Sequence, residues 1–304
     1  MKKTQIAKFV KFEYEPETDG RVFFVTDIHG QDEMFFEALK MLQFVNYPYE
    51  GEKADKLFGL GDMVDRGDGS LNVMSAFRHN PNYESLEGNH ERIMYLGTRT
   101  LPQISKYNSN AVIRGVDREH WLSQGGDWMS QHDFNAVREM ADWADTLPFA
   151  AELHIDGKVI GLTHAEVVAN ELATGGFEQD WFNDKNVMWE YTVRAAQTFT
   201  DKQKFNWREA YEYAMTFCRK AVRHNMELNV IGVDAVLHGH TIQEYNPLQQ
   251  GNSLYFDNGC FIKNTDNEKH PLNILEYAPS EDAILGLFKL YQFYYDDNAM
   301  LCIK

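Results

Sequence analysis

Apolar residues along the chain form two patterns, short continuous runs and longer stretches with helical spacing. Residues 21–26 and 57–60 are short, largely apolar runs that predict buried strands. Residues 31–44 and 70–79 repeat their apolar positions at helical spacing and predict amphipathic helices, and Asn-Pro-Asn at 80–82 is expected to end the second one. Strands that alternate with helices in this order predict a mostly parallel sheet with right-handed crossovers.

The pattern changes in the second half of the chain, where hairpins become more frequent. Residues 149–155 and 159–163 are rich in strand formers and flank a short loop, Asp156-Gly157-Lys158, so they predict a β-hairpin. Four later stretches are also expected to be strands: residues 230–237, 253–256, 272–277 and 284–291, the last of which also fits a helix. Residues 91–147 and 206–228 are expected to be helical. This change predicts a second sheet packed against the first.

Composition narrows the possible partners. Of the 304 residues, 43% are hydrophobic and 13% aromatic, enough for a large core. The formal net charge of -17 argues against nucleic acid or an anionic membrane as a partner, because both are bound by clustered Lys and Arg. The three cysteines lack Cys-x-x-Cys pairing and predict neither a disulfide framework nor a zinc ribbon. We expect no signal peptide and no membrane span, and therefore a cytoplasmic protein.

Side chains that can bind metals follow five of the strand-like runs. The five segments are Asp27-Ile28-His29-Gly30, Gly61-Asp62-Met63-Val64-Asp65-Arg66-Gly67, Gly88-Asn89-His90-Glu91, His164-Ala165 and His238-Gly239-His240-Thr241. Because open α/β sheets bind ligands at the carboxyl ends of their strands, we expect these segments to meet. Asp62 and Asp65 would repel each other unless a cation lay between them. A charged surface turn could explain that segment alone, but not five strand ends with related chemistry.

These blocks resemble, in order and approximate spacing, those of the calcineurin-like metallophosphoesterases, and within them the phosphoprotein phosphatases. Residues 121–128, Trp-Leu-Ser-Gln-Gly-Gly-Asp-Trp, and Asp257-Asn258-Gly259-Cys260 add a resemblance to the bacteriophage lambda type of Ser/Thr protein phosphatase. The resemblance covers about residues 21–262. It implies an α/β fold, a metallophosphatase β-sandwich of two mixed sheets flanked by helices. We expect a single domain over 1–304, with a helical insertion at about 166–228 and a C-terminal extension from about 263.

The resemblance also implies a centre of two divalent metal ions. Asp62 is expected to bridge the two ions, with Asp27 and His29 completing the first site. The second site is expected to be completed by Asn89, His164 and His240. Mn is the expected metal, and Fe or Zn also suits this mixture of carboxylate, amide and imidazole ligands better than Ca does.

Three neighbouring residues are expected to act on the phosphate. Arg66 is expected to bind its oxygens, since a guanidinium matches phosphate bidentately, and Asn89 is expected to add a contact. By the same resemblance His90 protonates the leaving oxygen, and Asp65 orients His90 and raises its pKa.

A second phosphate-binding arginine is usual in the family, but its expected place after Trp189 is taken by Glu190 and Tyr191. Arg194, one helical turn further on, is expected to replace it. Glu166 also departs from the family pattern, and the sequence assigns it no role.

The leading interpretation is a metal-dependent phosphomonoesterase, a Ser/Thr protein phosphatase in which metal-bound hydroxide attacks phosphorus directly. An alternative is a dinucleoside polyphosphate or other nucleotide phosphohydrolase. A non-catalytic phosphate-binding scaffold is less favoured, because all the expected ligands and catalytic residues are present. The expected partner is a phosphoprotein or a phosphorylated small molecule in the cytoplasm, which would be the host cytoplasm for a phage-encoded chain. The sequence leaves the oligomeric state open.

Overall fold

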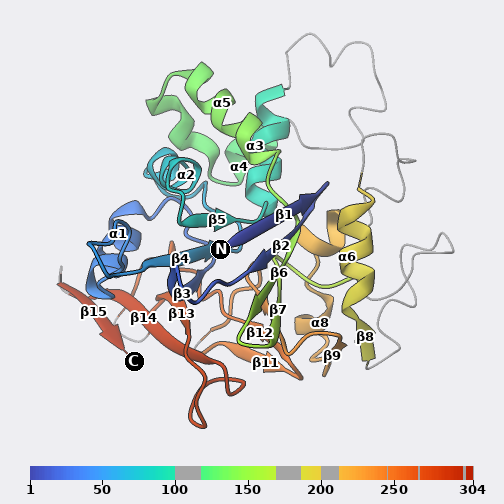
Figure 1. Cartoon of the computed structure of the whole chain (residues 1–304). Helices are drawn as coiled ribbons and strands as arrows, with labels where there is room; N and C mark the ends of the chain where they lie inside the picture. The colour runs from blue at the N-terminus through green and yellow to red at the C-terminus, as the bar shows by residue number, and fades with distance from the viewer. Residues whose placement is uncertain are drawn as a thin grey trace, which may run out of the picture.

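Two β-sheets are packed face to face, and helices cover the outer face of each sheet (Figure 1). The computed structural model describes residues 1–99, 118–168, 186–199, 212–244, 246–265, 268–296 and 299–303. The predicted α/β sandwich of two mixed sheets with flanking helices is therefore confirmed. No helix in these ranges has both the length and the apolarity needed to cross a membrane.

The first sheet contains the alternating units that the sequence predicts. Its six strands are, from edge to edge, β15 (Ala299–Ile303), β14 (Phe288–Asp296), β13 (Leu272–Tyr277), β3 (Asp19–Val25), β4 (Ala54–Gly59) and β5 (Tyr83–Ser85). Strands β3, β4 and β5 are parallel and are joined through α1 (Asp32–Met41) and α2 (Ser70–His79). Strand β13 pairs antiparallel with β3, so the stretch expected as a C-terminal extension supplies an interior strand of this sheet.

The second sheet is built largely from hairpins. Its seven strands are, from edge to edge, β1 (Lys2–Ile6), β2 (Phe9–Glu13), β6 (Ala150–Ile155), β7 (Lys158–Thr163), β10 (Ala235–His238), β12 (Ser253–Tyr255) and β11 (Leu248–Gln250). The predicted hairpin is confirmed as the antiparallel pair β6 and β7. Strand β10 runs parallel to both β7 and β12, which brings the ends of β7 and β10 side by side.

Apolar side chains pack in three layers, one between the two sheets and one between each sheet and the helices that cover it. Between the sheets, Phe24 stacks on Phe58 with ring centroids 5.6 Å apart, and Phe12 meets Phe58 edge to face at 5.0 Å. Phe23 and Val25, the alternate residues of β3, are buried against the helices instead. Because both faces of β3 are covered over residues 22–25, that part of the strand is continuously apolar rather than alternating.

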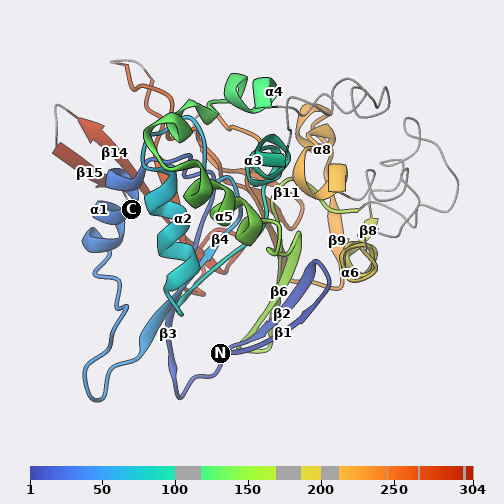
Figure 2. The same cartoon turned by 90° about the horizontal axis from the view of Figure 1, so that it is seen from above.

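The helices form two groups on opposite sides of the sandwich (Figure 2). Beside the first sheet lie α1, α2, α3 (Asn89–Arg99), α4 (Arg118–Ser123), the 3-10 helix η3 (Gly126–Gln131) and α5 (Phe134–Ala144). On the second sheet lie α6 (Trp189–Gln197) and α8 (Lys220–Arg223), with a two-stranded sheet of β8 (Asn186–Met188) and β9 (Asn229–Ile231). Residues 169–185 and 200–211 of the expected insertion lie outside the described residues.

Two of the predicted strands are interrupted by a turn in the structure. The stretch 230–237 is divided into β9 and β10, because Gly232 turns the chain with a φ of +101°. The stretch 284–291 contains a turn, in which Leu285 and Gly286 have φ angles of 54° and 69°, and β14 begins only at Phe288. It is a strand and not a helix from that residue onward.

Candidate metal centre

The site lies where β3, β4, β5, β7 and β10 end. Loop 27–30 is held against loop 61–63 by backbone hydrogen bonds, among them His29 N to Asp62 O at 2.9 Å. Gly61, with a φ of +98°, allows the next loop to approach closely, since a Cβ there would lie 2.6 Å from Gly88 N. A Cβ on Gly88 would in turn lie 2.3 Å from Asp62 Oδ1. The glycines of these blocks are therefore required by close packing of the loops.

Several of the loop residues have a left-handed backbone although they are not glycine. They are Asp27, His29, Asp62, Asp65, Arg66 and His240, with φ between 48° and 70°. This conformation is unfavourable for such residues and is concentrated at functional sites, where the surrounding structure enforces it. These loops therefore depend on the surrounding structure to hold their backbone conformation.

Three histidines point one nitrogen at this site and donate the other N–H to a backbone carbonyl. His29 Nδ1 lies 2.9 Å from Val64 O, His164 Nδ1 lies 2.8 Å from Leu60 O, and His240 Nε2 lies 3.1 Å from Phe217 O. Such a bond fixes the ring and its tautomer, and leaves the other nitrogen available to a metal. The arrangement is typical of histidines that ligate a cation.

Asp62 lies between two groups of ligand atoms. His29, Asp62 and His90 form one group, and Asp62, His164 and His240 form the other, with the ligand atoms of each group within 4.8 Å of one another. Asp62 Oδ2 lies 3.7 Å from His29 Nε2 and 3.4 Å from His164 Nε2. A carboxylate shared in this way is suited to bridge two ions.

The remaining expected ligands, Asp27 and Asn89, lie at the same place. Asp27 Oδ1 is 3.9 Å from His29 Nε2. One atom of the Asn89 amide lies 3.0 Å from His164 Nε2, 2.7 Å from His240 Nδ1 and 3.3 Å from Asp62 Oδ2. With its oxygen there, the amide adds a lone pair to a cluster of nitrogen and carboxylate lone pairs, a donor set that fits a divalent transition metal.

Buried charge sets the protonation of these groups. Burial alone would raise the pKa of Asp62, but His164 and His90 outweigh it and hold that pKa well below its usual range. Burial lowers the pKa of His29 and of His240 well below the usual value, so both are neutral and able to ligate a metal. Burial acts in the same direction on His164, but Asp62 outweighs it and raises the pKa of His164 to about 9.

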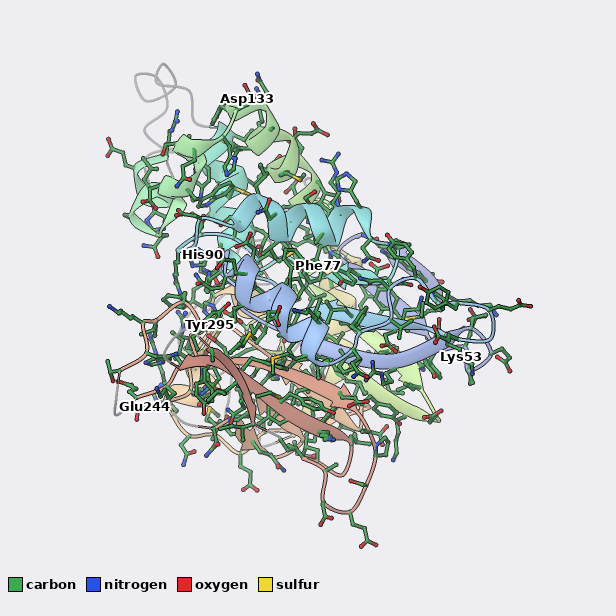
Figure 3. The ribbon with its side chains drawn as sticks, turned by 90° about the vertical axis from the view of Figure 1, so that its left-hand side faces the viewer. Lys53, Phe77, His90, Asp133, Glu244 and Tyr295 are labelled. Carbon is green, nitrogen blue, oxygen red and sulfur yellow. The ribbon has the colours of Figure 1, made fainter. Side chains whose placement is uncertain are left out.

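His90 and Asp65 form a buried pair beside the ligands. His90, at the start of α3, is labelled in Figure 3, and its Nδ1 lies 2.7 Å from Asp65 Oδ2. Burial lowers the pKa of His90, but Asp62 and Asp65 outweigh it and raise that pKa above its ordinary value. Arg66 is exposed, and its two terminal nitrogens lie 3.1 Å from His29 Nε2 and 3.0 Å from His90 Nε2. Its guanidinium also stacks on Phe261, 4.1 Å from the ring centroid.

Residues 20–244 match the sequence model of the family described as calcineurin-like phosphoesterases. The chain belongs to this family. It is also 28% identical over 157 residues to serine/threonine-protein phosphatase 2 of Escherichia coli (strain K12). The aligned residues make up 51% of this chain and 62% of that relative. To serine/threonine-protein phosphatase 1 of Salmonella typhimurium (strain LT2) it is 30% identical over 110 residues, or 36% of this chain and 41% of that one. The matches thus span less than two thirds of each relative.

Solved structures share the fold at low sequence identity. A candidate diadenosine tetraphosphatase aligns with a TM-score of 0.50 and 15% identity, over 94% of this chain and 98% of its own. A protein serine/threonine phosphatase from Saccharomyces cerevisiae aligns with a TM-score of 0.50 and 13% identity, over 98% and 83%. At these low identities the alignments show only that the chain has the same fold as these two structures.

The structure gives the expected second arginine, Arg194, a carboxylate partner on its own helix. Arg194 is half exposed on α6, which packs on the outer face of the second sheet, and it pairs with Glu190 at 2.7 Å. Arg219 lies at the metal centre instead, with a terminal nitrogen 3.1 Å from His240 O and 3.4 Å from His240 Nδ1. In the described part of the chain it forms no ion pair with a carboxylate. Arg219 belongs to residues 206–228, which the sequence predicts to be a helix packed on the core. That pattern does not indicate that Arg219 lies beside His240.

Two glutamates of the site region support the loops. Glu91 accepts hydrogen bonds from the backbone N–H groups of Asp62, Met63 and Gly88 at 2.7 to 2.9 Å. Glu166, which the sequence left without a role, is buried and accepts a hydrogen bond from Ala221 N at 2.8 Å. It thereby connects the turn after β7 to α8, the segment that follows Arg219.

Replacing the shared carboxylate tests the centre directly. Asp62→Asn should abolish the binding of both ions, because each group of ligand atoms loses its common charged member. Metal content after dialysis against Mn, measured by mass spectrometry, checks this. Asp68→Asn makes the same change at an exposed position of the same loop, where Asp68 is paired with Gln131, and should leave metal content unchanged. Full metal content in Asp62→Asn would rule out this centre.

Proposed function

We propose that the chain hydrolyses phosphate monoesters in a metal-dependent reaction, with phosphoserine and phosphothreonine in proteins as its substrates. The observation that carries the proposal is the pair of ligand groups that share Asp62, the first of which includes His90, with Arg66 bonded to His90. Two divalent ions bound there would neutralise phosphate oxygens and lower the pKa of water. The proposed partner is a phosphorylated protein or small molecule, and the cytoplasm is the proposed compartment.

Two arginines can hold the phosphate from opposite sides of the ligand groups. Arg66 is exposed and lies next to His29 and His90, whereas Arg219 lies next to His240. A guanidinium binds phosphate oxygens through charge-assisted hydrogen bonds, often two at a time. We therefore assign the second phosphate contact to Arg219 in place of Arg194.

His90 is suited to protonate the leaving oxygen. Its Nδ1 is bonded to Asp65, so Nε2 is the nitrogen that faces Arg66 and the phosphate held there. Asp65 fixes the ring and favours its protonated form through an opposite charge at 2.7 Å. An alkoxide leaving group needs such a proton, because it is a poor leaving group without one.

A second candidate function is hydrolysis of nucleotide phosphates. Phe261 is partly exposed beside Arg66, and its ring also meets His29 edge to face at 4.8 Å. Ile242, with 39% of its surface exposed, packs near this loop, where a Cβ on Gly259 would lie 3.3 Å from it. An aromatic and aliphatic surface next to a phosphate site favours a base or an aromatic side chain as the group that carries the phosphate.

A substrate panel separates these functions. The purified chain is stripped with a chelator and assayed with and without Mn on phosphoserine and phosphothreonine peptides, diadenosine polyphosphates, cyclic nucleotides and nitrophenyl phosphate. We expect activity only with metal and the highest kcat/KM on the phosphopeptides. A preference for the diadenosine polyphosphates would establish the second candidate, and activity in the stripped protein would refute the metal centre.

The two arginines give a matched pair of variants. Arg219→Ala should lower kcat/KM about 10- to 100-fold on both a phosphopeptide and nitrophenyl phosphate, since it removes a charge-assisted contact to the phosphate that the substrates share. Arg194→Ala removes the same side chain from an exposed helix face and should change kcat/KM less than about twofold. The reverse order of effects would restore Arg194 as the phosphate ligand.

The role of His90 can be read from the leaving group. His90→Asn should lower kcat about 10²- to 10⁴-fold on a phosphoserine peptide, as expected for loss of general acid catalysis, and should change the metal content far less. On nitrophenyl phosphate the loss should be much smaller, because nitrophenolate departs without a proton. Equal losses on the two substrates would exclude His90 as the acid.

A further inference from the structure

The tryptophan-rich block at residues 121–128 makes an unusual contact with the site. Trp121 and Trp128 are 0% and 1% exposed, and their rings meet edge to face with centroids 6.1 Å apart. Both indole N–H groups point at one atom, Asp65 Oδ1, at 2.9 Å and 2.8 Å. Two tryptophans can pack in a core without donating to the same acceptor. The shared acceptor therefore indicates a role connected with Asp65.

The two hydrogen bonds determine how the Asp65 carboxylate is turned. Asp65 is 0% exposed, and its second oxygen, Oδ2, accepts the hydrogen bond from His90 Nδ1 at 2.7 Å. An indole N–H can only donate, so two of them can bond only to an oxygen with free lone pairs. Rotation of the carboxylate would break both bonds at once. Oδ2 is therefore kept facing His90 by groups on the opposite side of Asp65.

The same block also fixes the backbone next to Asp65. Gly125 lies between the two tryptophans and accepts a hydrogen bond from Arg66 N at 2.9 Å. Asp65 and Arg66 are consecutive left-handed residues, with φ of 70° and 69°, a conformation that needs outside support. A Cβ on Gly125 would lie 2.6 Å from Arg66 N, so only glycine permits this approach. One segment thus contacts both the carboxylate of the pair and the loop that carries the arginine.

We infer that Trp121 and Trp128 are positioning residues for proton transfer by His90, acting through the two hydrogen bonds that orient Asp65. The inference rests on the proposed function, in which His90 protonates the leaving oxygen. Neither tryptophan is exposed, so both act through Asp65 and not by contact with a substrate. Their effect is to hold Asp65 Oδ2 against His90 Nδ1, so that Nε2 stays directed at the leaving group.

Replacement by phenylalanine tests this with little change in packing. Trp121→Phe and Trp128→Phe keep an aromatic ring and remove one N–H each. Each should lower kcat on a phosphoserine peptide about 10-fold, as for loss of one hydrogen bond to a charged group, with KM unchanged. On dinitrophenyl phosphate, whose leaving group needs no proton, the change should stay below about twofold. Equal losses on both substrates, or no loss on either, would overturn the inference.

Two control variants separate this effect from general damage. Trp189 is also buried, at 2% exposed, and donates to a carboxylate, Glu152 Oε1, at 2.7 Å on another part of the sandwich. Trp189→Phe should therefore show no dependence on the leaving group. Gly125→Ala displaces Arg66 and should raise KM on both substrates. A leaving-group dependence in Trp189→Phe as large as in the other two would overturn the inference.

A spectroscopic measurement tests the contact between the two indoles and Asp65 independently of catalysis. In ¹⁵N-labelled protein, Asp65→Asn should move the indole N–H resonances of Trp121 and Trp128 upfield, since a neutral acceptor binds them less strongly, and leave that of Trp189 in place. Unchanged resonances for all three would overturn the inference. A wild-type chain that hydrolyses no phosphate ester would instead refute the proposed function, while the shifted resonances would still establish the contact.

Discussion

Buried carboxylates that follow strands of both sheets are the constraint on which the rest of the site depends. Asp27, Asp62 and Asp257 are each 3% exposed or less. Burial and the other carboxylates raise the pKa of Asp27 and of Asp257 above the ordinary value, because the charges are close together and away from water. Such a cluster needs compensation by cations, by histidines or by backbone N–H groups.

Each of these carboxylates accepts a backbone N–H. His240 N donates to Asp27 Oδ2 at 2.9 Å and His90 N donates to Asp62 Oδ1 at 2.9 Å, each from a loop far away in the sequence. Asp257 is bonded within its own loop, to Gly259 N at 2.7 Å. The negative charge that demands a cation therefore also joins the loops that surround it. This dual use explains why the backbone is left-handed at so many ligand positions, since the loops bend to present N–H groups as well as side chains.

Much of the metal centre could be predicted from the sequence, because its side chains belong to short segments that follow predicted strands. Helix α2 has the predicted bounds, Ser70–His79, and the six expected ligands come together. Each segment is recognised from a few consecutive residues. The rule that the carboxyl ends of strands meet at one sheet edge then predicts that the segments come together in the fold. The hairpin of β1 and β2 was not predicted, because β1 is exposed at every position and has no apolar pattern.

The contacts missed from the sequence are those between segments that no local pattern connects. Arg219 contacts His240 because its segment passes the end of β10. The helical pattern at 206–228 does not predict this contact. Likewise, a spacing of seven residues between Trp121 and Trp128 predicts packing on one face, whereas their convergence on Asp65 depends on the turn at Gly125, with its φ of +98°.

The distribution of charge bears on how a phosphorylated substrate is attracted. With a net charge of -17, the chain as a whole repels phosphate, so long-range electrostatic steering opposes association. Under the proposed function, attraction would come from Arg66, Arg219 and bound divalent ions, within about one Debye length, ~8 Å at physiological salt. Contacts outside the phosphate would add binding energy that does not depend on this charge balance. The apolar surface of Phe261 and Ile242 beside Arg66 is the described part of the site that can supply such contacts.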